Sequence, residues 1–229
     1  MRGPECLHRT IDLTVDVLDP RMIKLPSWAA GDFCCFTDQR FVSLKDLINK
    51  FGGNLQPVKV RPMSGTQLHH GWAALNEKAG YELVFGFARV RACLELGLPV
   101  LAMVEQMSEV EALRQFFFES RSDGIWRPWR LGGTLEATLD SGCFPNLRRA
   151  SQVLGLSVTE AALMQQMGRV PAAIRMAFGE LELTPRQAKK LVDAMTTDPH
   201  KLLANASQIE GCKRLSASAV LAQLMEAGK

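Results

Sequence analysis

A single glycine between two short segments of helical patterning constrains the fold of this chain more than any other feature. The first segment places apolar or small side chains on one helical face: Leu147, Ala150, Val153 and Leu154. Gly155 follows them and can take the positive φ that a tight helix exit requires. Ser157 and Glu160 then have the spacing of a capping box. The pattern predicts two short helices, 146–154 and 158–168, joined by a tight turn, which is the outline of a helix-turn-helix.

The second predicted helix has an inward and an outward face. We expect the inward face to contain Val158, Ala161, Ala162 and Met167. The outward face then contains Thr159, Leu163 and Gln166, with Glu160 at its edge. A helix of this kind can enter the major groove of DNA with its N-terminal residues against base edges. An ordinary pair of packed helices is the alternative, and periodicity alone does not separate the two.

Composition excludes several other classes of protein. The 229 residues are 47% hydrophobic and 22% charged, which is typical of a globular chain of one or two domains. No apolar run reaches membrane-spanning length and no signal peptide is recognised, so we expect a cytoplasmic protein. The six cysteines form no CxxC pair and the four histidines complete no metal spacing. The net charge is only +3, but residues 121–190 hold ten arginines and lysines against six acids.

The two halves of the chain have different patterning, which predicts an α+β protein. The N-terminal half alternates expected strands (9–18, 56–61, 81–85, 100–104) with expected helices (43–51, capped by Ser43; 88–96; 108–120). Residues 20–41 are expected to be irregular, and residues 64–80 to form a hairpin connection or an excursion from the sheet. Helices alone are expected at 128–141, 146–154, 158–168, 171–178 and 185–195, with one or two more in the tail. We expect domains at 1–120 and 121–195, followed by a helical tail at 196–229.

An ordered set of phrases resembles the ParB family of DNA-partition proteins, especially its plasmid-type members. The phrases are 52–62 (GGNLQPVKVRP), 81–92 (YELVFGFARVRA), 96–100 (LGLPV), 129–132 (WRLG), 169–171 (RVP) and 183–188 (LTPRQA). The resemblance runs from about residue 9 to residue 192. It implies a small mixed-sheet N-terminal domain, of the type shared with sulfiredoxin, followed by an all-α helix-turn-helix domain.

The resemblance also implies a mechanism. ParB proteins are clamps, formed by two copies, that bind a palindromic centromere-like site on double-stranded DNA through the helix-turn-helix. CTP and Mg²⁺ close the clamp, and a ParA-type ATPase moves the DNA. The protein would then be associated with a nucleoid or a plasmid.

The nucleotide-binding residues that the resemblance implies fall in three places. Gly53 and Gln56 match the segment that lines the pocket, and Gly86, Arg89 and Arg91 match the phosphate box. Glu119 and Ser120 match the second box, with Glu119 as the Mg²⁺ ligand. The chain departs from the pattern at Phe87, Ala88, Ser120 and Asp123. Two cations and one acid are thereby lost, so we do not expect CTP hydrolysis, while CTP binding stays open.

The expected DNA contacts divide into base readers and phosphate contacts. Gln166 can pair with adenine, Glu160 can accept from cytosine and Leu163 can touch a thymine methyl group. Ser157, Thr159 and Ala162 are further expected DNA contacts, because they lie at the start of the same helix or along it. The candidate phosphate contacts are cations: Arg148, Arg149, Arg169, Arg186 and Lys189.

Two other functions use the same scaffold. One is a site-specific transcriptional repressor, which differs from a partition protein in needing no ParA-type ATPase. The other is an enzyme, either a reductase or a nuclease. A reductase needs a nucleophilic cysteine in the phosphate box, and Cys93 lies just after that box. A nuclease needs clustered acids for a metal, and only Glu119 and Asp123 are candidates.

Overall fold

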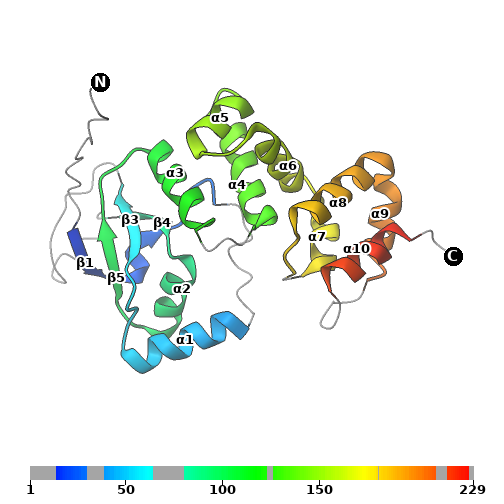
Figure 1. Cartoon of the computed structure of the whole chain (residues 1–229). Helices are drawn as coiled ribbons and strands as arrows, with labels where there is room; N and C mark the ends of the chain where they lie inside the picture. The colour runs from blue at the N-terminus through cyan, green and yellow to red at the C-terminus, as the bar shows by residue number, and fades with distance from the viewer. Residues whose placement is uncertain are drawn as a thin grey trace, which may run out of the picture. The chain divides into compact units, whose positions relative to one another are not determined.

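The computed structural model describes residues 14–29, 39–63, 80–122, 126–179, 181–209 and 216–226. The chain divides into two compact units (Figure 1). The first takes in Met1–Pro26 and Gln39–Ala112, and the second takes in Ser27–Asp38 and Leu113–Lys229. Among the described residues, no helix combines the length and the apolar character that a membrane span requires.

In the part of the chain that the structure describes, the first unit is built on a mixed five-stranded sheet. Its strands are β1 (Thr14–Leu18), β2 (Ile23–Lys24), β3 (Val58–Pro62), β4 (Tyr81–Phe85) and β5 (Val100–Val104), in the order β1-β5-β3-β4-β2. The pairs β1–β5 and β3–β4 are antiparallel, whereas β3–β5 and β2–β4 are parallel. Alternate side chains of the central strands β3 and β5 are fully buried and form the core of the sheet: Val58, Val60, Val100 and Ala102.

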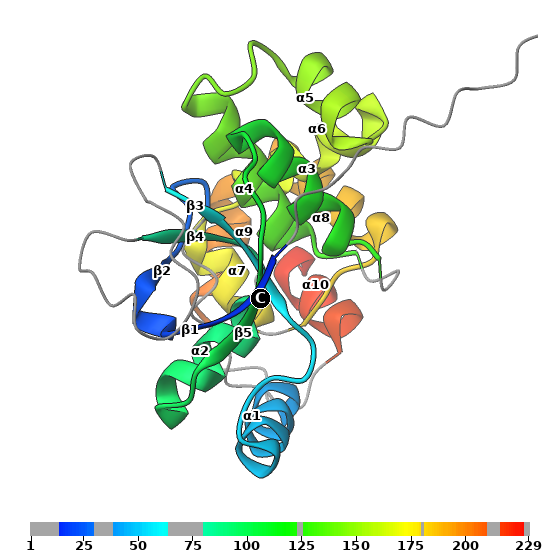
Figure 2. The same cartoon turned by 90° about the vertical axis from the view of Figure 1, so that its left-hand side faces the viewer.

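Helices α1 (Gln39–Phe51) and α2 (Phe87–Leu96) belong to this unit, with a 3-10 turn at Pro20–Met22. They pack against each other and lie side by side in both views (Figures 1 and 2). Helix α3 (Glu109–Glu119) begins in the first unit and ends in the second.

Several expectations for this half need correction. Helix α1 begins at Gln39, so the prediction that Ser43 caps it is wrong; Ser43 lies within the helix and is exposed. Nothing in the segment before Ser43 breaks a helix, and Phe41 is buried, which favours the earlier start. The strand β2 and the 3-10 turn lie in the stretch that we expected to be irregular. Residues 9–13 of the first expected strand and residues 64–79 of the expected hairpin lie outside the described residues.

The second unit is helical. After the end of α3 it contains α4 (Pro128–Asp140), α5 (Leu147–Leu154), α6 (Val158–Gly168), α7 (Ala172–Phe178), α8 (Pro185–Thr197), α9 (Pro199–Ala206) and α10 (Ala217–Met225). The expected bounds of the helices from α4 to α8 are confirmed to within two residues. Trp28 also belongs to this unit, where its ring lies 5.0 Å from that of Phe116. The sheet of one unit and the helices of the other make the protein α+β.

Two glycines let α4 and α6 cross with their backbones in contact. A Cβ built on Gly132 would lie 2.2 Å from the carbonyl oxygen of Met164, and one on Gly168 would lie 2.4 Å from the carbonyl oxygen of Gly132. Both positions therefore require glycine, because backbone atoms cannot move aside as a flexible side chain can. The crossing fixes α6 against α4.

Candidate nucleic-acid interface

Helices α5 and α6 are joined by a turn whose geometry follows from three residues. Asn146 caps α5, because its side chain accepts a hydrogen bond from Arg149 N at 2.9 Å. Gly155 ends the helix in the left-handed region, with φ 68° and ψ 34°. Ser157 caps α6, its hydroxyl accepting from Glu160 N at 3.1 Å. Helix α6 therefore begins at Val158, three residues after Gly155, as predicted from the sequence.

The expected faces of α6 are confirmed in part. Ala161 and Met167 are fully buried, and Thr159 and Gln166 are exposed, as expected. Val158 is 53% exposed, so its assignment to the inward face is wrong. The inward position is taken instead by Met164, which is fully buried.

Two other residues of α6 lie between these faces. Ala162 is half-buried. Leu163 is also half-buried and packs against the core cluster around Met167 and Ile174, so its assignment to the fully outward face is wrong. The apolar side of α6 is therefore rotated toward Leu163, and the polar residues Thr159 and Gln166 dominate its exposed face.

Cations flank this helix pair, and most of them face solvent. Arg148 and Arg149 are exposed on α5, and Arg186 and Lys189 are exposed on α8. Arg169, which follows α6, donates from Nε to Glu136 Oε1 at 2.7 Å. The carboxylate of Glu136 offsets the positive charge of Arg169, although the Arg169 side chain remains 62% exposed.

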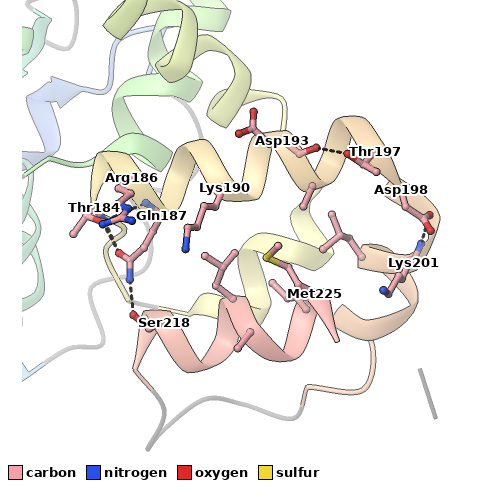
Figure 3. Close-up of a pocket in the computed structure, with 15 residues that line it drawn as sticks. Thr184, Arg186, Gln187, Lys190, Asp193, Thr197, Asp198, Lys201, Ser218 and Met225 are labelled. Carbon is pink, nitrogen blue, oxygen red and sulfur yellow. Dashed lines mark hydrogen bonds between the residues drawn. The ribbon is translucent and has the colours of Figure 1, made fainter. Parts of the chain in front are cut away.

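Helix α8 is held at its start by a complete capping box. The hydroxyl of Thr184 accepts from Gln187 N at 3.3 Å, and Gln187 Oε1 accepts from Thr184 N at 2.8 Å. Gln187 also donates to Ser218 Oγ at 2.8 Å and so connects α8 to α10 (Figure 3). Arg186 is therefore carried on a firmly capped first turn.

A groove of about 900 Å³ lies between α8, α9 and α10 (Figure 3). Charged side chains of both signs line the groove: Arg186, Lys190 and Lys201 are positive, and Asp193 and Asp198 are negative. Its leucines are already buried by the helices, since Leu202, Leu221 and Leu224 are between 0% and 5% exposed. A partner docking here would thus cover little additional leucine surface.

The glycine of the expected phosphate box has a packing role. Gly86 precedes α2 with φ 100°, and a Cβ there would lie 2.6 Å from Cγ1 of Val58. Phe87, which stands where the family has an acid, is 4% exposed. The close approach at Gly86 is therefore to the protein's own sheet.

The two arginines of this box are bonded to the protein. Arg89 Nη1 donates to the carbonyl oxygens of Gln56 at 3.0 Å and Pro57 at 2.8 Å. Arg91 Nε donates to Glu95 Oε1 at 2.8 Å, four residues along the same helix. Gly53, which is half-buried, and the exposed Gln56 belong to the connection between α1 and β3.

Glu95 completes this network of bonded groups. It also accepts from Lys45 Nζ at 2.7 Å. The hydrogen bonds from Lys45 and then from Arg91 hold the pKa of the Glu95 carboxyl below its ordinary value. Arg91 and Lys45 thus share one carboxylate within the first unit.

The remaining expected nucleotide residues lie in the second unit. Glu119 ends α3, and Ser120 is 3% exposed, with its carbonyl oxygen accepting from Arg127 Nη1 at 2.8 Å. Asp123 lies outside the described residues. The described residues contain no group of three His, Cys, Asp or Glu side chains placed to hold a metal ion. Phe87 is buried and both arginines bond protein atoms, so CTP binding by these residues stays a prediction.

Cys93 has the surroundings of a structural thiol. It is fully buried, with Sγ 3.8 Å from Asn54 Oδ1, and burial raises the pKa of the thiol. Asn54 itself is 5% exposed and holds β5 through bonds to the backbone N and O of Leu101 at 2.8 and 2.9 Å. A raised pKa disfavours the thiolate that a reductase needs.

Sequence reasoning missed one residue that contacts the helix pair. Arg121, which follows α3, donates from Nη1 to the carbonyl oxygen of Gly155 at 3.2 Å. Its Nη2 forms an ion pair with Glu160 Oε1 at 3.1 Å. The two contacts join residues 34 and 39 positions apart, so no local pattern could have identified them.

No protein-family model and no curated protein matches the chain. Among solved structures, the chain is similar to the C-terminally truncated chromosome-partitioning protein ParB from Caulobacter crescentus complexed to the centromeric parS site. The identity is 23%, the similarity covers 92% of this chain and 99% of that one, and the TM-score is 0.42.

Two further structures are similar at lower identity. The same truncated Caulobacter crescentus ParB complexed with CTP-gamma-S is 21% identical, with 86% of this chain and 98% of that chain covered and a TM-score of 0.34. The C2221 form of a Pnob8-like ParB-N domain is 10% identical, with 94% of each chain covered and a TM-score of 0.45.

Proposed function

We propose that this protein is a sequence-specific DNA-binding protein of the ParB type, which acts in plasmid or chromosome partition by binding a centromere-like site. One observation carries the proposal. Helix α6 starts at the Ser157 cap and exposes Thr159 and Gln166, while the adjacent α5 exposes Arg148 and Arg149. Polar readers on one helix beside cations on the other are what major-groove recognition requires.

The exposed residues divide the work of binding. Gln166 has a carbonyl and an amide group and can pair with adenine, and the Thr159 hydroxyl can contact either kind of base pair. Arg148 and Arg149 contact phosphates and set the register, with Arg186 and Lys189 of α8 extending the contact. Arg169 contributes less, because Glu136 shares its charge. A palindromic site would be read by two copies of the chain, one for each half-site.

The proposal includes no nucleotide-dependent step. Arg89 and Arg91 stabilise the first unit through their bonds to Gln56, Pro57 and Glu95. A ParA-type ATPase remains the partner that the sequence resemblance implies for moving the bound DNA.

Capture of DNA fragments followed by sequencing tests this function. Purified protein is incubated with fragmented genomic and plasmid DNA, with and without CTP and Mg²⁺, and the bound fragments are sequenced. We expect one sharp peak that contains a palindrome and has the same height under both conditions. A Thr159→Ala/Gln166→Ala variant is the control, and its peak should collapse.

Other outcomes of the same experiment are informative. Peaks scattered over promoters would favour a repressor. Absence of any enriched fragment would contradict sequence-specific DNA binding by this chain.

A further inference from the structure

Arg121 connects the end of α3 to the turn between α5 and α6. Its backbone is fixed in the turn after α3, since Arg121 N donates to Phe118 O at 3.2 Å. Its guanidinium donates a hydrogen bond to the carbonyl oxygen of Gly155, the C-cap residue of α5. It also forms an ion pair with the carboxylate of Glu160 in the first turn of α6. One planar, five-donor group therefore holds both helices at the point where they meet.

The contact changes the capping of α6. In α8 the third helical residue, Gln187, bonds back to the backbone N–H of the cap residue Thr184. In α6 the corresponding residue, Glu160, bonds to Arg121, so Ser157 caps its helix from one direction only. The two helices have the same sequence signature, and a long-range partner removes half of the capping box from one of them.

We propose that Arg121 is a positioning residue for DNA recognition, which fixes the start of α6 against α5 through Gly155 and Glu160. The proposal rests on the proposed function, because it concerns how that helix pair is presented to DNA. It also assigns Glu160 a role other than reading cytosine. The carboxylate of Glu160 is paired with Arg121 and is 27% exposed, so it serves as the anchor of the guanidinium.

Charge makes the pairing useful at this place. A carboxylate in the first turn of α6 stabilises the helix through its dipole but repels DNA phosphates when unpaired. Pairing with Arg121 offsets the repulsion while leaving the carboxylate in place. Loss of Arg121 should therefore harm binding in two ways, by loosening the turn and by leaving Glu160 as an uncompensated negative charge.

The test measures affinity by fluorescence anisotropy for two duplexes, the fragment enriched from genomic or plasmid DNA and a random duplex of equal length. The variants are Arg121→Ala, Arg121→Lys, Glu160→Gln and Arg121→Ala/Glu160→Gln. Lys201→Ala, which removes one cation from α9 in the same unit, is the matched control. Thermal unfolding of each variant checks that it is folded.

We expect Arg121→Ala to weaken binding to the enriched duplex about tenfold and to the random duplex about threefold or less. Arg121→Lys should recover only part of the loss, because an ammonium group cannot bond Gly155 and Glu160 in the same fork. Adding Glu160→Gln to Arg121→Ala should restore binding to the random duplex, since the repelling charge is removed. Lys201→Ala should bind both duplexes as the unchanged protein does.

Two results would overturn the proposal. If Arg121→Ala weakens both duplexes equally and lowers the salt dependence by about one phosphate contact, Arg121 binds phosphate directly. If it binds both as the unchanged protein does, the contact has no role in recognition. Either result leaves the proposed function standing, whereas absence of any enriched duplex removes the proposed function first.

Discussion

Two regions of the molecule carry a pair of nearby arginines, and they use them in opposite ways. On α2, Arg89 is bonded to two backbone carbonyls and Arg91 is paired with Glu95. On α5, Arg148 and Arg149 are exposed on a helix whose inner face is buried. The comparison teaches that a basic motif in a sequence gives a candidate binding site, whereas the partners of each guanidinium decide what it is available to bind.

The largest effect is expected from disrupting the close crossing of α4 and α6. Gly132→Ala places a Cβ 2.2 Å from the carbonyl oxygen of Met164 on α6, and that backbone atom cannot yield. We expect a loss of about 3 kcal/mol in the free energy of unfolding of the second unit, measured by chemical denaturation.

A glycine of the first unit provides the control for this substitution. In Gly53→Ala the new Cβ would lie 3.9 Å from Pro99 O, which is an ordinary contact, so stability should change little. Equal stability of the two variants would show that α4 and α6 do not cross as described.

Gln166→Ala removes a proposed base contact from the exposed face of α6. Gln166→Ala should cost about 1–3 kcal/mol of discrimination at one base pair of the enriched duplex, because the paired amide is lost. Binding to single-base variants of that duplex measures the change. A uniform loss over all positions would place Gln166 away from the bases.

Removing a bonded arginine should affect stability and leave DNA binding unchanged. Arg89→Ala deletes two charge-assisted hydrogen bonds to backbone carbonyls in a half-exposed setting, so we expect a loss of about 1.5 kcal/mol in the first unit. Denaturation of the first unit and anisotropy on the enriched duplex measure the two properties. Weaker DNA binding with unchanged stability would reverse the assignment of this arginine.

The exposed arginine should behave in the opposite way. Arg149→Ala should weaken binding to all sequences by about 1 kcal/mol and lower the slope of log affinity against log salt by about one. Its stability should be unchanged, since the helix cap uses only the backbone N of Arg149. A salt slope equal to that of the unchanged protein would contradict a phosphate contact.

The smallest effect is a pH dependence in the first unit. Lys45 and Arg91 lower the pKa of Glu95, so this carboxyl contributes stability above its ordinary pKa of 4.5 and loses it as the pH falls through the lower, folded value. The free energy of unfolding between about pH 5 and pH 3 should fall less steeply in Glu95→Gln. Identical slopes would show that the network does not affect stability.

Local signals in the sequence account for what could be predicted. Strands 81–85 and 100–104 and the bounds of α6 match the structure because apolar alternation, Gly155 and Ser157 act within a few residues. The contact of Arg121 with Glu160 spans 39 residues, and the packing that rotates Leu163 inward depends on other helices. The bonds of Arg89 to Gln56 and Pro57 likewise depend on the tertiary fold. The sequence of the phosphate box therefore could not show which of its arginines bond to the protein itself.

Backbone amide chemical shifts, recorded as the enriched duplex is added, test the central assignment most directly. We predict that the largest changes fall on residues 146–168 and on the first turn of α8, with little change on α2. Changes confined to residues 86–96, with none on α5 or α6, would contradict the account.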